Sequence, residues 1–277
     1  MDWLTNTKIP VGLWARAIFD WINAHFGGVI DSLAQFIENT FEFIVDALLL
    51  PPPLALVVVL TALGWLLQRR WQSAALIFFG FLFVINQGYW EETMQTLTLV
   101  VLACAACMGI GVPVGIAGAH NPRFYQSIVP VLDLMQTLPT FVYLIPTIVL
   151  FGIGIVPGLV ATVIFVLPAP IRLTYLGISS TPTALVEAAQ AFGATRRQLL
   201  WKVELPSALP QIMAGLNQAI MLSLSMVVIA GLVGADGLGV PVVRALNTVN
   251  TALGFESGFI IVIVAIMLDR TLRVRRK

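Results

Sequence analysis

Charged side chains are scarce in this chain of 277 residues, of which only 10% are Asp, Glu, Lys or Arg. Typical soluble domains carry about 25% charged residues. The three lysines all follow residues other than glycine, so the chain lacks the G-x-x-x-x-G-K-[ST] loop that cradles the phosphates of ATP. The net charge of +1 gives no general attraction to nucleic acid. We therefore expect neither nucleotide hydrolysis nor nucleic-acid binding in this chain.

Cysteine and histidine are also rare, with two residues of each. Cys104 and Cys107 have the C-x-x-C spacing of redox and metal motifs, but they lie in an apolar run without His, Asp or Glu nearby. We interpret them as packing residues and predict no disulfide and no metal site. His25 and His120 are predicted to lie in loops. Without clustered polar groups at membrane depth, an intramembrane enzyme is excluded, and we predict no catalytic residues.

Hydrophobic residues dominate, at 58% of the chain. A membrane-spanning helix needs about 20 mostly apolar residues. The sequence therefore predicts an all-α integral membrane protein with about seven transmembrane helices. Their approximate ranges are 52–68, 72–90, 94–118, 127–150, 155–177, 208–233 and 253–269.

The first fifty residues do not have the pattern of a signal peptide. Apolar side chains recur on roughly one side of a predicted helix between residues 30 and 50, and acidic residues interrupt the rest. This pattern predicts an amphipathic helix that lies on a membrane surface or against the protein. Three prolines at 51–53 end it. The apolar side consists of Ile30, Leu33, Phe36, Ile37, Phe41, Ile44 and Leu48.

The distribution of basic residues predicts the orientation of the chain, because cytoplasmic loops carry an excess of Lys and Arg. With seven spans, all but three of the 15 basic residues fall on one side. The exceptions are Lys8, Arg16 and Arg244. We therefore predict that the N-terminus lies outside and the C-terminus inside.

The sequence divides into four predicted parts. Residues 1–50 form the interfacial amphipathic segment, 51–91 two peripheral transmembrane helices, 92–270 the core and 271–277 a basic cytoplasmic tail.

An unusually polar loop interrupts the apolar second half. Residues 183–192 favour a helix, Gly193 breaks or bends it, and a second short helix is predicted to stop at Pro206. This helix–glycine–helix arrangement favours a docking element for a cytoplasmic partner over a solvated loop that merely orients the chain. Its predicted apolar seat comprises Leu185, Ala189, Phe192, Leu199, Leu200 and Val203.

The same loop resembles the EAA signature of ABC-importer permeases. That signature reads EAA, three residues, glycine, nine residues and I-x-LP, and it differs here only in Val203 for isoleucine. The resemblance identifies residues 181–206 as the coupling segment, which in this family contacts an ATPase subunit. The site residues it implies are Glu187, Ala188, Ala189, Gly193, Arg196, Arg197, Val203, Leu205 and Pro206.

Further motifs resemble the ProW/ChoW/OpuAB branch of permeases for glycine betaine, proline betaine or choline. They include LDLMQTLPTFVYLIPTIVLFGIG at 132–154 and LPSALPQIMAGLNQAIMLSLSMVVIAGLVGADGLG at 205–239. The resemblance implies a type I ABC-importer permease fold in a bacterial inner membrane. It also implies two ATPase subunits that bind ATP and Mg²⁺, an external substrate-binding protein and a permease homodimer.

Two other transporter classes are alternatives to this interpretation. An ABC permease for another small solute, such as an amino acid, stays open. A secondary transporter driven by an ion gradient would need more ionisable residues within the spans than Asp133, and internal repeats, which we do not find.

Several residues are candidates for the solute path or the outer gate. Asp133 in a predicted span suggests a cation path, with pairing to Arg123, Arg172 or a helix end as the alternative. Phe141 and Tyr143 could contact a quaternary ammonium group through their ring faces, although such aromatics usually serve packing or membrane anchoring. In GADGLG, the residues Asp236, Gly237 and Gly239 indicate a tight turn before a short helix containing Arg244. That turn is either an outer gate or a simple loop.

Overall fold

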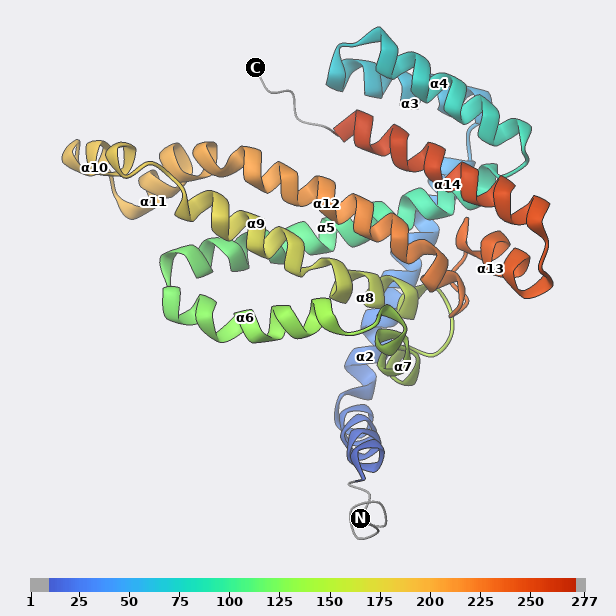
Figure 1. Ribbon diagram of the computed structural model, residues 1–277, viewed down its shortest axis with the longest axis horizontal. Helices are drawn as coiled ribbons and strands as arrows, with labels where there is room; N and C mark the ends of the chain where they lie inside the picture. The colour runs from blue at the N-terminus through green and yellow to red at the C-terminus, as the bar shows by residue number, and fades with distance from the viewer. Residues whose placement is uncertain (1–9, 273–277) are drawn as a thin grey trace.

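The computed structural model describes residues 10–272, and all regular elements in that range are helices, as predicted. They form an elongated bundle with α10 and α11 at one end and α13 at the other (Figure 1). The helices are α2 (Val11–Leu49), α3 (Pro53–Gln68), α4 (Trp71–Asn86), α5 (Trp90–His120), α6 (Pro122–Thr137), α7 (Thr140–Phe151), α8 (Ile155–Val166), α9 (Pro168–Ser179), α10 (Thr183–Ala191), α11 (Arg196–Leu199), the π-helical turn η1 (Leu200–Glu204), α12 (Leu205–Gly231), α13 (Gly239–Thr248) and α14 (Thr251–Leu272).

Four helical stretches of the described chain are long and apolar enough to cross a bilayer. They correspond to the predicted spans 94–118, 155–177, 208–233 and 253–269. The helices α3 and α4 have 16 residues each, fewer than the roughly 20 that a perpendicular span needs. Counting each bent helix pair as one span gives up to six, so seven spans stay a prediction. The four stretches are Trp90–His120, Ile155–Ser179, Arg196–Gly231 and Thr251–Thr271.

The predicted span 127–150 is not a single helix. It consists of α6 and α7, which are bent by 100° relative to each other. Leu138, between them, is extended because a residue that precedes proline is driven out of the helical region, and Pro139 follows it. The break turns α7 out of the line of α6 and places it beside α8 and α2 (Figure 1).

Helix α2 runs across the bundle rather than along it (Figure 1), and a bend of 102° after Leu49 separates it from α3. The proline run therefore ends α2 as predicted. The second half of α2 packs against α5, α7 and α8, with Phe41 and Val45 buried. Leu33 and Phe36 are exposed, contrary to prediction, because the inward stripe follows the 3.6-residue period more strictly. That stripe is Ile30, Ala34, Ile37, Phe41, Ile44, Val45 and Leu48.

Three helices, α5, α9 and α12, form the centre of the bundle, where they contact one another extensively. Glycines allow this close approach, as is common in membrane proteins. A Cβ atom on Gly115 of α5 would lie 2.6 Å from the Cβ of Thr174 and 2.7 Å from the carbonyl oxygen of Ile171, both on α9. These helices lead to the polar loop 181–206 at one end of the bundle and to the GADGLG turn near the other.

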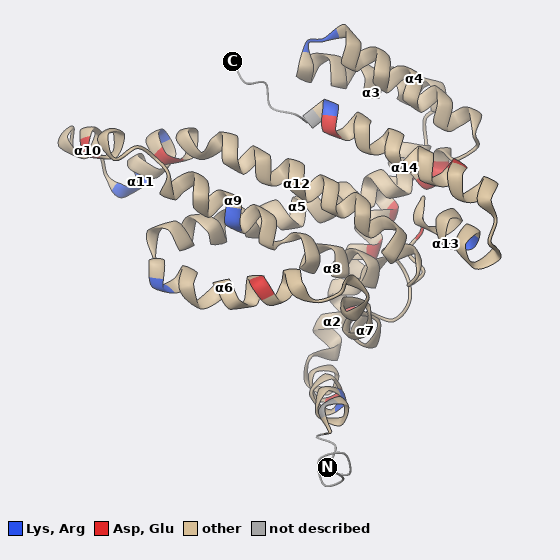
Figure 2. Ribbon diagram, viewed as in Figure 1, with Lys and Arg blue, Asp and Glu red and all other residues tan. Residues whose placement is uncertain are grey.

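Helices α3, α4 and α14 form a peripheral group beside this centre (Figure 1). The predicted division of the chain, with residues 51–91 as two peripheral transmembrane helices, stays a prediction. Basic residues lie on α11 and at the start of α6 at one end of the bundle, where α10 also carries an acidic residue, and acidic residues lie at the start of α5 nearer the other end (Figure 2). The basic tail 271–277 falls almost entirely outside the described residues.

Candidate functional site

The coupling segment folds as two short helices joined at a glycine, as the sequence predicts. Helix α10 ends at Ala191, and Gly193 takes the left-handed conformation with φ of 78°. The N–H of Ala194 donates to the carbonyl of Ala189 at 3.0 Å, which closes the helix end. Glycine favours this position because it has no side chain to clash in that region.

A capping box begins the second helix. The hydroxyl of Thr195 accepts from the N–H of Gln198 at 3.3 Å, and the side chain of Gln198 accepts from the N–H of Thr195 at 2.9 Å. These two bonds fix the angle at which the chain leaves Gly193. Neither residue was predicted as part of the site, although T-x-x-Q before an apolar run is a recognisable helix start.

The second helix does not stop at Pro206, which corrects the prediction. Helix α11, the π-helical turn η1 and α12 form one continuous stretch, Arg196–Gly231. The N–H of Leu205 donates to the carbonyl of Leu200, five residues back, so the turn is widened immediately before the proline. Pro206 then occupies the first turn of α12, where a missing N–H costs little. The coupling segment is therefore continuous with α12.

The apolar seat of the segment is smaller than predicted. Ala189, Leu199, Leu200 and Val203 are half-buried, but the side chains of Leu185 and Phe192 face solvent. Phe192 is 93% exposed and Trp201, on the neighbouring turn, is 63% exposed. Both are large apolar side chains exposed within an otherwise polar segment.

Unpaired charges surround these exposed apolar groups. Within residues 10–272, ion pairs join Arg16 to Asp20, Arg172 to Asp133 and His120 to Glu204, and none involves the exposed charges of the segment. Ala188 is exposed beside Glu187, whereas Leu205 is half-buried at the start of α12. The exposed charges are Glu187, Arg196, Arg197 and Lys202.

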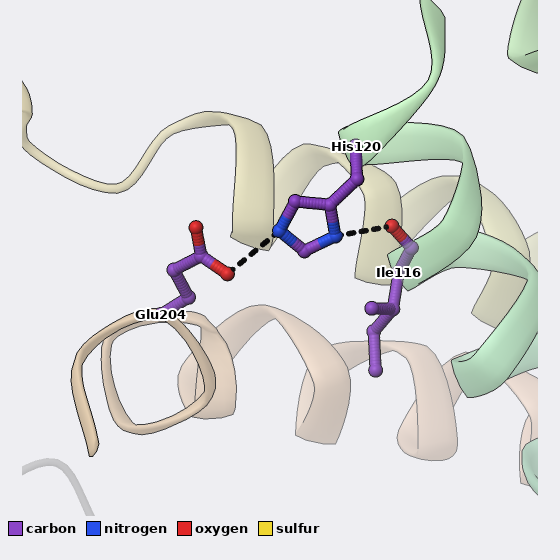
Figure 3. Close-up of polar contacts among 3 residues, drawn as sticks. All are labelled: Ile116, His120 and Glu204. Atoms are coloured by element: carbon purple, nitrogen blue, oxygen red, sulfur yellow. Dashed lines mark hydrogen bonds and ion pairs between the residues drawn. The ribbon is translucent and has the colours of Figure 1, made fainter. Parts of the chain in front are cut away.

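A histidine–glutamate contact joins the C-terminal end of the coupling segment to α5 (Figure 3). The Nε2 atom of His120, the last residue of α5, lies 2.9 Å from Oε2 of Glu204, and its Nδ1 atom lies 3.0 Å from the carbonyl oxygen of Ile116. Glu204 is buried, with 7% of the residue exposed. The sequence alone does not predict this pair, because 84 positions separate the two residues and no local pattern links them.

Asp133 pairs with Arg172 rather than standing free in a span. The Nη2 atom of Arg172 donates to Oδ1 of Asp133 at 2.5 Å, which ties α6 to α9. Tyr125 and Tyr175 stack beside them with ring centroids 3.5 Å apart. This is the pairing alternative considered for Asp133 from the sequence.

The two aromatic candidates in α7 have different surroundings. Tyr143 is buried, its hydroxyl donates to the carbonyl of Met135 in the last turn of α6, and its ring contacts Phe165. Phe141 is 58% exposed on the outer face of α7. Tyr143 thus stabilises the α6–α7 break, and the structure does not bring the two rings together around a cavity.

The GADGLG sequence forms the predicted tight turn before a short helix. Gly237 has φ of 123°, and the N–H of Leu238 donates to Oγ1 of Thr96 on α5 at 2.9 Å. A Cβ atom on Gly239 would lie 2.2 Å from the carbonyl oxygen of Val227, so α13 packs directly against α12. Thr96, which anchors the turn, was not singled out from the sequence.

A polar pocket of about 320 Å³ opens beside this turn, and Asp236 and Gly237 line it. Burial, followed by the charges of Glu256 and Glu92, raises the pKa of Tyr89, which lies in the connection between α4 and α5. The phenol therefore stays neutral at physiological pH. The remaining lining residues are Glu91, Glu92, Gln95, Val240, Pro241, Arg244 and Leu253.

Cys104 and Cys107 are free and buried, in agreement with a packing role. The Sγ atom of Cys104 lies 3.8 Å from Oγ of Ser223, and Sγ of Cys107 lies 3.6 Å from the carbonyl oxygen of Val163. The part of the chain that the structure describes contains no group of three or more metal-ligating side chains.

Comparison with known families shows that residues 111–269 match the family described as binding-protein-dependent transport system inner membrane component. The chain is 44% identical, over 98% of its length and 96% of the relative, to the glycine betaine transport system permease protein OpuAB of Bacillus subtilis. It is 45% identical, over 95% of its length and 94% of the relative, to the glycine betaine/carnitine transport permease protein GbuB of Listeria monocytogenes. Similarity to ProW of Escherichia coli, a glycine betaine/proline betaine permease, is 43% over 98% of this chain and 76% of that one.

The fold is similar to that of a solved ABC importer. A chain of the MetNI methionine ABC transporter in an inward-facing conformation gives a TM-score of 0.58 at 25% identity. The match covers 65% of this chain and 93% of that one. The predicted type I ABC-importer permease fold is confirmed by this likeness and by the family match.

Proposed function

This chain belongs to the family of binding-protein-dependent transport system inner membrane components, and from that premise we propose that it imports quaternary ammonium osmolytes. It is an integral membrane permease of the ABC type. The substrate class is inferred from relatives at 43–45% identity that are named as permeases for glycine betaine, with proline betaine or carnitine in two of them. The likeness to a methionine transporter concerns the fold and does not favour an amino acid substrate.

The observation that best supports the proposed transport mechanism is the exposure of the coupling segment and its continuity with α12. An exposed helix pair projects from one end of the bundle, and its second helix continues through the π-helical turn into α12, a central helix (Figure 1). A force on α10 and α11 therefore reaches the middle of the bundle through a continuous helical connection. We propose that a cytoplasmic ATPase dimer, which binds ATP and Mg²⁺, binds this helix pair.

Alternating access follows from this connection. Closure of the ATPase subunits moves the coupling segment and α12, and thereby shifts the bundle between inward- and outward-facing packings. These packings must differ by only a few kcal/mol for nucleotide and loaded binding protein to select between them. We propose that two copies of this chain form the pathway in a bacterial inner membrane, with the N-terminus outside. The GADGLG turn and its polar pocket would face the external binding protein.

Co-purification and reconstitution test this function. The full chain should co-purify with an ATPase subunit, and the assembly in liposomes should hydrolyse ATP faster when a binding protein loaded with glycine betaine is added. Solute uptake should require both ATP and that binding protein. Uptake by this chain alone, without an ATPase, would contradict the proposal.

The substrate class has its own test. Competition by choline, proline betaine and carnitine, but not by methionine, should reduce uptake of labelled glycine betaine. Preferential uptake of an amino acid would instead favour the alternative substrate.

A further inference from the structure

The contact between His120 and Glu204 needs a proton. The Nδ1 atom of His120 faces the carbonyl oxygen of Ile116 at 3.0 Å, and its Nε2 atom faces the carboxylate of Glu204 at 2.9 Å (Figure 3). Carbonyl and carboxylate oxygens are acceptors, so the two contacts together require one proton more than a neutral imidazole and an ionised carboxylate carry. A neutral imidazole has one N–H and satisfies only one of the two contacts. The pair is complete when the ring is the imidazolium cation and Glu204 is ionised.

The contact joins two elements that the coupling mechanism must connect. His120 is the last residue of α5, and α5 packs against α9 and α12 at the centre of the bundle. Glu204 is the last residue of the π-helical turn between α11 and α12. Such turns are frequent at functional sites because they interrupt the regular helix. The ion pair therefore fixes the inner end of α5 to the most irregular turn of the coupling segment.

No second cation on the surrounding elements replaces His120 within residues 10–272. Arg172 pairs with Asp133, and none of the other charged groups forms an ion pair with His120 or Glu204. Helix α12 carries no charged residue. A carboxylate that is 10% exposed loses its compensation when the imidazolium is neutralised. The ionisable groups on the neighbouring elements are Arg123 and Tyr125 of α6, Arg172 and Tyr175 of α9, Glu187 of α10, Arg196 and Arg197 of α11 and Lys202 of η1.

We propose that His120 is a positioning residue that fixes the coupling segment to α5 only while this pair holds its proton. The proposal rests on the proposed function, in which the segment transmits the work of the ATPase. Protonation keeps η1 and α5 together, so motion of α10 and α11 moves both α5 and α12. Loss of the proton removes this polar connection and leaves the segment joined to α5 only by apolar packing, in which Leu200 and Leu205 share a cluster with Ile116 and Ala119. Transport per ATP hydrolysed then falls as the pH on the inner side rises.

A single amide substitution separates the proton from the contact itself. In Glu204→Gln, the side-chain NH₂ donates to the lone pair on Nε2 of a neutral His120, while Nδ1–H still donates to Ile116. This variant keeps both hydrogen bonds without the extra proton. It should therefore retain coupling at high pH, where the native pair loses it. His120→Ala removes the contact at every pH.

The experiment uses the full chain assembled with its ATPase and binding protein in liposomes. Solute transported per ATP hydrolysed is measured while the pH on the ATPase side is raised from about 5 to about 8, the range in which histidines change charge. Because the ratio is taken per ATP hydrolysed, an effect of pH on the hydrolysis rate itself cancels. We expect the native ratio to fall severalfold, the Glu204→Gln ratio to stay flat and the His120→Ala ratio to be low throughout.

His25 supplies a matched control. Its Nδ1 atom contacts the carbonyl of Trp21 at 2.9 Å, one helical turn back, as His120 contacts Ile116, but no ion pair involves it among the described residues. His25→Gln should therefore keep the native pH profile. A native-like slope in Glu204→Gln, or native coupling in His120→Ala, would overturn the proposal.

A second measurement detects the protonation of the His120 ring directly, without measuring transport. In ¹⁵N spectra of the chain labelled at histidine, His120 should show two protonated ring nitrogens at low pH, and its signal should move toward that of a neutral ring as the pH rises. If no ATPase assembles but these signals behave as expected, the proposed function fails and the protonated pair stands. If the assembly transports but the profiles of the native chain and Glu204→Gln coincide, the inference fails alone.

Discussion

Gly193 holds the angle between the two helices of the coupling segment. A Cβ atom there would meet nothing within 4 Å, so the constraint is the backbone φ of 78° and not space. Gly193→Val should cost about 1–3 kcal/mol locally, because a β-branched residue rarely adopts a left-handed conformation. We expect ATPase activity to persist while solute uptake per ATP drops, with membrane insertion unchanged.

Asparagine is the matched control for this position, since it tolerates the left-handed region. Gly193→Asn should keep most of the coupling. If both variants lost coupling equally, the cause would be a contact that the surface of the coupling segment makes with its partner, and not the backbone angle at Gly193. Normal uptake by Gly193→Val would remove Gly193 from the coupling mechanism.

Variants of the ion pair between Asp133 and Arg172 can distinguish a structural role of Asp133 from a role in solute binding. Exposed pairs contribute about 0.2–1 kcal/mol, and both side chains are partly exposed. Asp133→Asn should therefore lower thermal stability slightly and leave the KM for solute unchanged. Exchanging the two residues, Asp133→Arg with Arg172→Asp, should restore the loss. A KM that rises severalfold in Asp133→Asn and is not restored by the exchange would place Asp133 on the solute path.

At the level of single residues, local patterns predicted more than long-range contacts did. The helix break at Gly193 and the packing role of Cys104 follow from their immediate neighbours in the sequence. The pairing of His120 with Glu204 joins residues 84 positions apart, one at the end of α5 and the other near the C-terminal end of the coupling segment. Only the packing of α5 beside α12 brings them together, and a sequence without an alignment carries no signal for it.

Helix packing at the centre of the bundle depends on the absence of side chains at the contact. A Cβ atom on Gly115 of α5 would come within 2.7 Å of the Ile171 carbonyl oxygen, a backbone atom that cannot rotate away. Gly115→Ala should therefore separate α5 from α9 and lower the unfolding temperature in detergent.

Gly109 lies in the same helix, and a Cβ atom there would meet nothing within 4 Å. Gly109→Ala should be neutral or stabilising by up to about 1 kcal/mol, because alanine favours the helix more than glycine does. Equal destabilisation by both substitutions would show that the backbone freedom of glycine, and not close packing, matters in α5.

The elements that the sequence placed wrongly share one cause, which is proline. Pro206 was expected to end a helix, but the widened turn η1 accommodates its ring and the helix continues. Pro139 was placed inside a span, but it breaks that span into α6 and α7. Pro113 lies inside α5 without ending it. Whether proline stops, bends or joins a helix depends on the hydrogen bonds its neighbours find, which tertiary packing decides.

For the whole molecule, hydrophobicity and charge predicted an all-helical membrane protein with a polar segment at one end, and the structure agrees. The number of spans is less directly determined. Helix α2 crosses the bundle, and α3 and α4 are short, so length and composition alone give between four and six spans. Orientation therefore depends on the basic residues rather than on a count of helices.

Site-directed cysteine labelling tests that orientation, and the two native cysteines should not interfere because they are buried. Cys104 and Cys107 are 6% and 0% exposed, so a membrane-impermeant maleimide should leave them unlabelled in the folded chain. Arg197→Cys, on the exposed coupling segment, should react only after the inner face is made accessible, because the excess of basic residues predicts that side to be cytoplasmic. Asn247→Cys, exposed in α13 at the other end of the bundle, should react in intact cells. The two positions are predicted on opposite sides of the membrane, so each serves as the other's control. Labelling of Arg197→Cys from outside would invert the orientation and remove the coupling segment from any cytoplasmic ATPase.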